Sequence, residues 1–169
     1  MALFGSSRDA SLVRHLNKEL LHNVVNQQCA FYKYEIEKTN TNIYGESAGG
    51  KYYSGPVLFN SLIEVGDNTS PTNDFGVDFD WSITVALLRD DLVEANVHPE
   101  VGDIILYQES YFEIDNTNIT QFWAGKDPDY PYENNPLNPN LAQFGYNVSV
   151  VCFCHYVPSD RLGLVPQRL

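Results

Sequence analysis

The three cysteines carry the most reactive side chains of the sequence, and two of them lie two positions apart. Cys152 and Cys154 form half of a possible zinc site or a redox pair, with Cys29 as a third thiol. Residues two apart on a strand share a face, so both thiols lie beside valines while His155 points to the other side. A structural zinc site needs a second ligand pair. We therefore expect three free thiols that pack as small core side chains, and no metal.

Histidines and paired carboxylates are the other groups suited to hydrolysis. The four histidines are His15, His22, His98 and His155. No nucleophile motif accompanies any of them, and the sequence has no glycine-rich phosphate loop of the required spacing. Pairs such as Asp90-Asp91 arise by chance in so acidic a chain, and alternation places Glu113 and Asp115 on the solvent side of a strand. We expect no catalytic residue and no cofactor.

A helix is predicted for residues 8–26. Its apolar residues recur at every fourth position: Leu12, Leu16, Leu20 and Val24. A stripe with this spacing lies on one helix face and packs on a sheet or on a partner. The charged residues between, including Arg14 and Lys18, are predicted to point into water.

Period-two alternation follows the helix and predicts strands. They cover about residues 29–36, 57–65, 80–89, 102–107, 111–116 and 146–157, with a turn at 108–110. One helix, six antiparallel strands and long polar loops predict a mainly β protein, a small antiparallel β-barrel with an N-terminal helix and long loops. Residues 1–157 are expected to form one domain, followed by a tail at 158–169.

The formal charge of −12 is unevenly distributed. Residues 64–133 hold 16 of the 22 acidic residues but only two basic ones. Nucleic-acid binding draws its affinity from Lys and Arg that neutralise phosphates, so we do not expect direct DNA binding. The polar loop at 66–78 carries Asp67, Asp74 and Asp78 and no base.

A long proline-rich segment at 123–145 resists both helix and strand. Its apolar and aromatic side chains include Trp123, Tyr130, Tyr132 and Leu137. We expect this segment to be an arm that packs on its own barrel or on a neighbouring subunit. The sequence contains no signal peptide and no apolar run of membrane length, so we expect synthesis in the cytoplasm and no membrane contact.

The run PEVGDIILYQESYFEI at residues 99–114 resembles a hairpin of the neck (head-completion) protein of T4-like contractile-tailed bacteriophages. Shorter similar pieces follow the same order along residues 8–157: CAFY at 29–32, TNIYGE at 41–46, YSGP at 53–56 and LLRDDL at 87–92. The chain is shorter than those proteins and lacks their long C-terminal extension.

The resemblance implies a structural virion protein and no enzyme. Such proteins form a ring, hexameric by resemblance, that closes the DNA-filled head below the portal and adaptor and offers a docking face to the tail terminator. The chain would be made in the host bacterial cytoplasm and end in the virion neck, where DNA passes without specific binding.

Two sets of residues acquire expected roles from this resemblance. Asp67, Asp74 and Asp78 would line the DNA channel, and a solvated outer loop is the alternative. Trp123, Tyr130, Tyr132 and Leu137 would contact neighbouring subunits or rings. Three other readings stay open: another connector or tail-completion ring protein, a carbohydrate-binding β module with an exposed aromatic platform, and a small hydrolase with a histidine and two carboxylates in one cleft.

Overall fold

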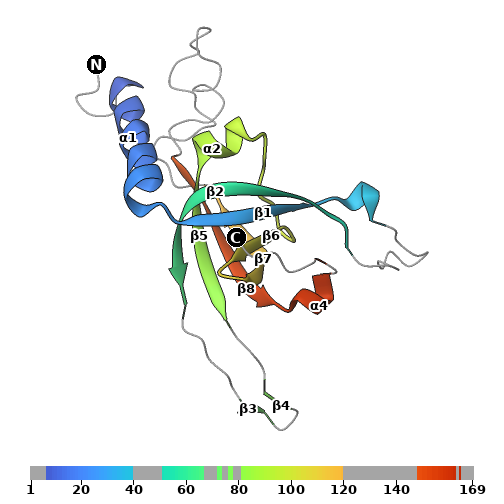
Figure 1. Cartoon of the computed structure of the whole chain (residues 1–169). Helices are drawn as coiled ribbons and strands as arrows, with labels where there is room; N and C mark the ends of the chain where they lie inside the picture. Colours follow the sequence, from blue (N-terminus) through green and yellow to red (C-terminus); the bar gives the residue numbers. More distant parts are fainter. Residues whose placement is uncertain are drawn as a thin grey trace.

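The structure is a computed structural model that describes residues 7–39, 51–66, 72–73, 76–77, 81–119, 148–162 and 164. Side chains are described within these ranges except at 7–10, 72–73 and 76–77. The protein is mainly β and contains a closed six-stranded antiparallel barrel with a helix at its N-terminal side (Figure 1). The predicted fold class is confirmed.

The barrel strands follow the order β1-β2-β5-β8-β7-β6, and β6 closes onto β1. Their bounds are β1 Gln28–Tyr34, β2 Tyr53–Val65, β5 Ser82–Leu88, β6 Ile104–Tyr107, β7 Ser110–Asn118 and β8 Ser149–Val157. A separate pair, β3 (Thr72–Asn73) and β4 (Gly76–Val77), extends away from the barrel at the end of the long β2–β5 connection (Figure 1). The predicted loop at 66–78 therefore includes a short antiparallel ladder.

The barrel interior is filled by the inward-facing set of each strand. Its largest fully buried members include Phe31, Ile83, Leu87, Phe112 and Ile114. Burying one such side chain stabilises the fold by about 1.5–3 kcal/mol. Because β-branched and aromatic residues alternate with polar ones along these strands, the sequence favours strands over helices there.

Part of the outer surface of β1, β6 and β7 is also buried, which the alternation did not predict for β1. A row of directly paired residues crosses it, from Ala30 through Leu106 and Tyr111 to Val157 on β8. A short helix, α4 (Ser159–Leu162), places Leu162 in the same cluster, which Leu164 joins. We name this surface the covered wall. Strand β1 is therefore buried on both faces and is not half-buried as predicted.

The outer surface of β2, β5 and β8 has no such cluster among the described residues. Leu62 pairs with Ala86, and Ala86 pairs with Val151, so the three lie side by side across the outside of the barrel. Leu62 is 54% exposed, and Phe153 on β8 is 42% exposed. We name Leu62, Ala86, Val151 and Phe153 the bare wall.

The predicted hairpin is confirmed as β6 and β7. The turn residues Gln108 and Glu109 have φ values of 46° and 66°, the left-handed pair that a two-residue hairpin turn requires. Asn116 and its neighbours continue β7 past a register shift between Ile114 and Asn116. Glu113 and Asp115 lie on the outer side, as predicted, where they pair with Lys51 and His155.

The helices differ more from the prediction than the strands do. Helix α1 (Ser7–Glu19) continues into a π-helical segment, η1 (Leu20–Val25), so the predicted helix at 8–26 is confirmed. A second helix, α2 (Arg89–Glu94), was not predicted, and a 3₁₀ turn, η2 (Ile36–Lys38), follows β1. None of the helices in the described ranges has the length and apolar character needed to cross a bilayer.

The residues predicted to line a DNA channel, Asp67, Asp74 and Asp78, lie outside the described residues. The arm at 123–145 lies there too, with its predicted contact residues Trp123, Tyr130, Tyr132 and Leu137. Both expectations stay predictions. The tail at 158–169 is described at 158–162 and 164, where it covers part of the barrel.

Candidate interaction surface

Helix α1 turns its apolar stripe away from the barrel. Leu12, Leu16 and Leu20 are 50 to 58% exposed, and Val24 is 73% exposed. We name these four residues the apolar ridge. An ordinary surface helix presents its apolar stripe to the core and its charged residues to water. The sequence left open whether the stripe packs on a sheet or on a partner, and the structure excludes the chain's own sheet.

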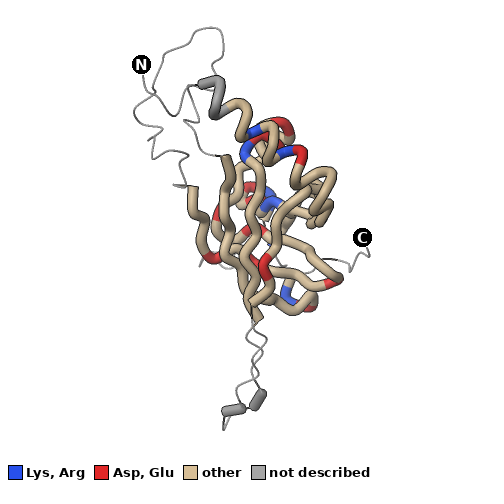
Figure 2. Tube along the Cα trace, turned by 90° about the vertical axis from the view of Figure 1, so that its left-hand side faces the viewer, with Lys and Arg blue, Asp and Glu red and all other residues tan. Residues whose placement is uncertain are grey.

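Two basic residues of α1 face the protein instead, which corrects the prediction that Arg14 and Lys18 point into water. Arg14 forms an ion pair with Asp90 at the start of α2. Lys18 Nζ lies 3.1 Å from Asp91 Oδ1 and 3.4 Å from Glu94 Oε2. Figure 2 shows the basic positions of α1 next to acidic positions of the neighbouring element. Arg14 and Lys18, four residues apart, thus hold the polar side of the helix against α2.

The third basic position of this row is His22, whose Nε2 lies 2.7 Å from Asp91 Oδ2. Asp91 therefore contacts Lys18 of α1 and His22 of η1, and its side chain is only 12% exposed. The hydrogen bond to Asp91 raises the pKa of the Lys18 amine, while burial and the nearby Arg89 guanidinium lower the pKa of Arg14.

The base of the helix is anchored to the barrel just before β1. Asn26, with φ 45°, ends η1 in the left-handed conformation, and its N–H donates to the Leu21 carbonyl. The Gln27 carbonyl accepts from Ser61 N at 2.8 Å, and its side chain donates to the Tyr107 hydroxyl at 2.6 Å. Gln27 thereby ties the helix to two strands. Together with the ion pairs, these contacts fix which face of α1 points outward.

A hollow of about 250 Å³ lies beside this junction, and its lining combines His22, Asp91 and Glu94 with Leu58 and neighbouring backbone. A histidine and two carboxylates thus meet in one cleft, the arrangement that would favour a hydrolase. Both carboxylates, however, pair with Lys18 of α1, and among the described residues no hydroxyl or thiol side chain lines the hollow. His22, Asp91 and Glu94 therefore act as contacts that hold α1 and η1 against α2.

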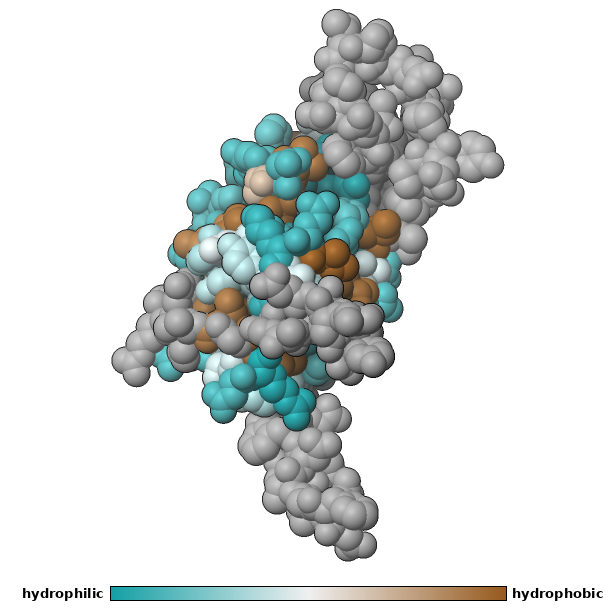
Figure 3. Space-filling model, turned by 90° about the vertical axis from the view of Figure 1, so that its right-hand side faces the viewer, coloured by the Kyte–Doolittle hydropathy of each residue, from teal (hydrophilic) through white to brown (hydrophobic). Residues whose placement is uncertain are grey.

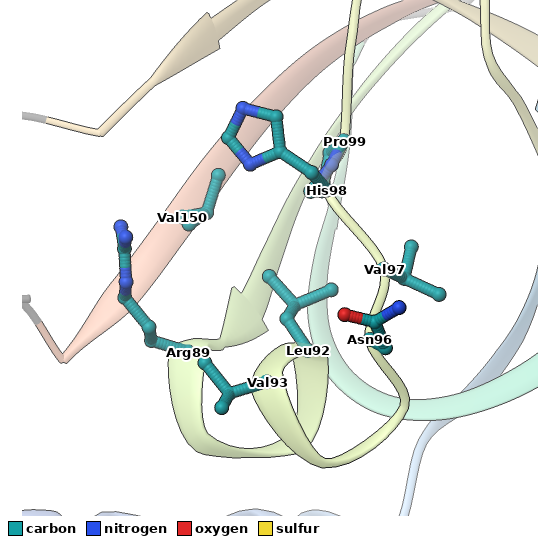
Figure 4. Close-up of a pocket in the computed structure, with 8 residues that line it drawn as sticks. All are labelled: Arg89, Leu92, Val93, Asn96, Val97, His98, Pro99 and Val150. Atoms are coloured by element: carbon teal, nitrogen blue, oxygen red, sulfur yellow. The ribbon is translucent and has the colours of Figure 1, made fainter. Parts of the chain in front are cut away.

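A second hollow of about 210 Å³ separates α2 and the segment after it from β8. Figure 4 shows Leu92 and Val150 among the side chains around it, together with Arg89 and His98. Burial lowers the pKa of the Arg89 guanidinium. Among the described residues, this lining is apolar and basic and contains no hydroxyl, thiol or carboxylate side chain.

Asp103 lies inside the run that resembles the phage hairpin and is only 1% exposed. Its Oδ1 accepts from the Tyr34 N–H at 2.9 Å, and its Oδ2 accepts from the Glu100 N–H at 2.8 Å and from Lys33 Nζ at 3.0 Å. Burial raises the pKa of this carboxyl despite these donors. Asp103 therefore braces the β1–β6 seam that closes the barrel, a role that the sequence analysis missed.

The cysteines occupy the core as predicted. Cys29, Cys152 and Cys154 are free and at most 2% exposed. Burial raises the pKa of Cys29 to about 11 and that of Cys152 to about 12, and it raises the pKa of Cys154 further. Thiols held neutral in this way are poor nucleophiles and poor metal ligands. No group of three or more metal-ligating side chains occurs in the described part of the chain.

No family model matches the chain, and a search of curated proteins finds no similar sequence. The inference of function therefore depends on the surface features of the described residues. Figure 3 shows separate apolar patches between hydrophilic residues on the face opposite to that of Figure 2. The apolar ridge differs from such patches because ion pairs on the other side of α1 hold it outward.

Proposed function

We propose that this protein is a structural ring subunit of the head-to-tail connector of a contractile-tailed bacteriophage. In this role it closes the DNA-filled head below the portal and adaptor and offers a docking surface to the tail terminator. It performs no catalysis. Another connector or tail-completion ring of the same neck remains an alternative within the same class.

The observation that carries the proposal is the outward-facing apolar ridge of α1. This ridge exposes four apolar side chains to solvent: Leu12, Leu16, Leu20 and Val24. An exposed apolar surface of this kind is typical of proteins that function in contact with others. The resemblance of residues 99–114 then indicates which kind of assembly is involved. A small barrel with an appended helix is compatible with this role but does not define it.

The acidic character of the chain supports the same reading. Residues 64–133 hold 16 of the 22 acidic residues, and a negative channel wall repels DNA phosphates within a Debye length of about 8 Å. Asp67, Asp74 and Asp78 are the residues proposed for that wall. Trp123, with Tyr130, Tyr132 and Leu137, is proposed for contacts between subunits or rings.

A carbohydrate-binding module is the alternative from another class. It requires a flat platform of exposed aromatic rings. Among the described side chains, the exposed aromatic residues are Tyr52, just before β2, and Phe153, on β8, at 47% and 42% exposure, so they lie on different elements of the barrel. No observation favours this alternative over the connector.

The test is cryo-electron microscopy of tailed and tailless particles that contain the protein. We expect a symmetric ring of density between portal and tail into which the barrel fits, with an acidic loop toward the axis. Absence of the protein from particles would remove the structural proposal, and a glycan array would then be the next measurement.

A substitution in the arm provides an independent check. Trp123→Ala is expected to reduce the yield of joined heads and tails while leaving the unfolding midpoint of the isolated protein close to that of the wild type. Normal assembly together with a lowered midpoint would show that Trp123 belongs to the core and makes no intersubunit contact.

A further inference from the structure

The hollow of about 210 Å³ between α2, the segment after it and β8 combines an aliphatic lining with basic groups. Its apolar members are Leu92, Val93, Val97, Pro99 and Val150. Among the described residues, the basic side chains of this lining are Arg89 and His98. We propose that this hollow binds the carboxylate group of a ligand with a short branched aliphatic body. This site goes beyond the proposed function and does not depend on it.

The walls of the hollow are fixed by the fold. Leu92 and Val150 belong to the barrel core at 3% and 2% exposure, and Val97 packs against the same core. The Val97 N–H donates to the Leu92 carbonyl at 2.9 Å. At the start of α2, the Arg89 N–H donates to the Val148 carbonyl at 3.0 Å. A ligand therefore enters a preformed site, and its binding does not have to order the chain first.

The size of the hollow limits the ligand. Sites for whole drug-sized molecules occupy about 300–1,000 Å³. This hollow has about 210 Å³, roughly the space of seven water molecules at about 30 Å³ each. A short-chain acid, or one acidic side chain with an aliphatic neighbour, is a ligand of this size.

The basic groups give the hollow a charge opposite to that of the whole chain, which has a formal charge of −12. In Figure 4 Val150 lies between the Arg89 guanidinium and the His98 ring, so the basic groups flank an aliphatic side chain. Arg14 lies close enough to Arg89 for the two like charges to repel, and an anion beside Arg89 offsets that repulsion. Arg89 also interacts with other residues of the chain, and the five N–H donors of a guanidinium allow it to bind a carboxylate as well.

A carboxylate with an aliphatic body suits this lining better than a phosphate does. A phosphate has charged oxygens on all sides, and aliphatic side chains would remove its water without replacing the hydrogen bonds. A branched aliphatic acid instead places its one charged group against Arg89 and its alkyl group against Leu92 and Val97. The planar guanidinium also matches the two oxygens of a carboxylate.

NMR titration of the full chain tests the site with small probes. The probes are 4-methylpentanoate, its neutral amide, acetate and inorganic phosphate at equal ionic strength, and the signals followed are Arg89 Nε–H and the amides of α2 and β8. We expect 4-methylpentanoate to bind at least about tenfold more tightly than its amide, which lacks the charge-assisted hydrogen bonds. Acetate should also bind at least about tenfold more weakly, because it lacks the alkyl group that the lining buries.

Val93 allows a matched test of charge, because it lines the hollow and is 37% exposed. Val93→Asp places a carboxylate in the lining and should weaken binding of 4-methylpentanoate at least about tenfold, whereas the uncharged Val93→Asn should stay within about threefold of the wild type. Arg89→Gln should weaken binding at least about tenfold, and Arg161→Gln, at an exposed arginine of α4, should leave it unchanged. Circular dichroism and the unfolding midpoint show that each variant is folded.

Equal binding of 4-methylpentanoate and its amide would overturn the proposal, and so would equal losses in Val93→Asp and Val93→Asn. Phosphate that binds as tightly as the acid would overturn it too. A peptide with blocked ends and a glutamate between two leucines distinguishes the sources of the carboxylate. Tighter binding of this peptide than of the free acid supports the site with a partner segment as its ligand, and weaker binding supports it with a free short-chain acid.

Discussion

Two rows of apolar residues cross the outside of the same barrel, and only one of them is covered. The row Ala30, Leu106, Tyr111 and Val157 lies beneath α4, and its members are at most 6% exposed. The row Leu62, Ala86 and Val151 has the same strand-to-strand pairing but begins with a leucine that is 54% exposed. The first row stabilises the fold, whereas the second is available to another molecule.

The difference teaches that outward apolar residues of a barrel have two distinct uses. The covered wall is covered by α4, which lies far along the chain from Ala30, Leu106 and Tyr111. Alternation within a strand does not reveal contacts with so distant a segment. The bare wall has no counterpart within the described residues. The predictions below either separate the two walls further or remove the distinction.

The largest difference is expected between one leucine of the covered wall and one of the bare wall. Leu106→Ala should lower the free energy of unfolding by about 2–5 kcal/mol, since a buried leucine leaves a cavity. Leu62→Ala, the same change on the bare wall, should stay within about 0.5 kcal/mol of the wild type. Urea unfolding measures both. Equal losses at the two positions would mean that both walls belong to the core.

A smaller loss is expected at the seam beneath the covered wall. Asp103→Ala removes the acceptor of two backbone N–H groups and of Lys33, which should cost about 1–3 kcal/mol of unfolding free energy. Glu100→Ala removes an exposed carboxylate from the same lysine and should cost less than about 1 kcal/mol. Thermal unfolding of the two variants compares them. A cost at Glu100 equal to that at Asp103 would contradict the seam role.

The smallest effect on stability is expected at the docking of α1. Asp91→Asn weakens the contacts to Lys18 and His22 and should cost about 1 kcal/mol, while Glu94→Gln at a 78% exposed side chain should cost less than about 0.5 kcal/mol. Hydrogen exchange should show faster exchange of α1 amides in Asp91→Asn, with β5 and β8 unchanged. Unchanged protection of α1 would show that other contacts hold the helix.

The pH dependence of that variant has a definite sign. The pKa of Lys18 in the folded state is raised above its ordinary value of 10.5, so the contribution of the Lys18–Asp91 pair is complete below pH 10.5 and is lost as pH rises through the raised pKa. The stability difference between wild type and Asp91→Asn should therefore shrink in strongly alkaline solution. A difference that grows there would contradict the pairing.

Much of the fold could be predicted because periodicity reports which residues share a face. The helix at 8–26, the strands and the hairpin turn at Gln108 and Glu109 follow from local patterns and are confirmed. Periodicity does not report which face turns inward. The ridge of α1 was therefore located correctly, but the charged residues Arg14 and Lys18 were wrongly assigned to water.

A signal for the docking of α1 was present in the sequence. Arg14, Lys18 and His22 are spaced by four, and an acidic trio stands at Asp90, Asp91 and Glu94. Either set alone has no special meaning in a chain with 22 acidic residues. Their match becomes visible only when β5 places α2 beside α1, a contact across about seventy positions of the chain. Asp103 was missed because an aspartate is expected at the protein surface. The backbone N–H groups of Tyr34 and Glu100 that bind it come together only in the folded barrel.

The position of β8 in the barrel bears on how the chain is made. β8 is the last strand in the sequence, yet it lies between β5 and β7. A protein leaves the ribosome N-terminal end first, so a nascent chain carries both neighbours of this strand before the strand itself exists. Until residues 149–157 emerge, β5 and β7 each present an unpaired edge, the feature that most readily recruits other strands. Newly synthesised chains are therefore most at risk of aggregation, and most in need of chaperones, in the interval before β8 emerges.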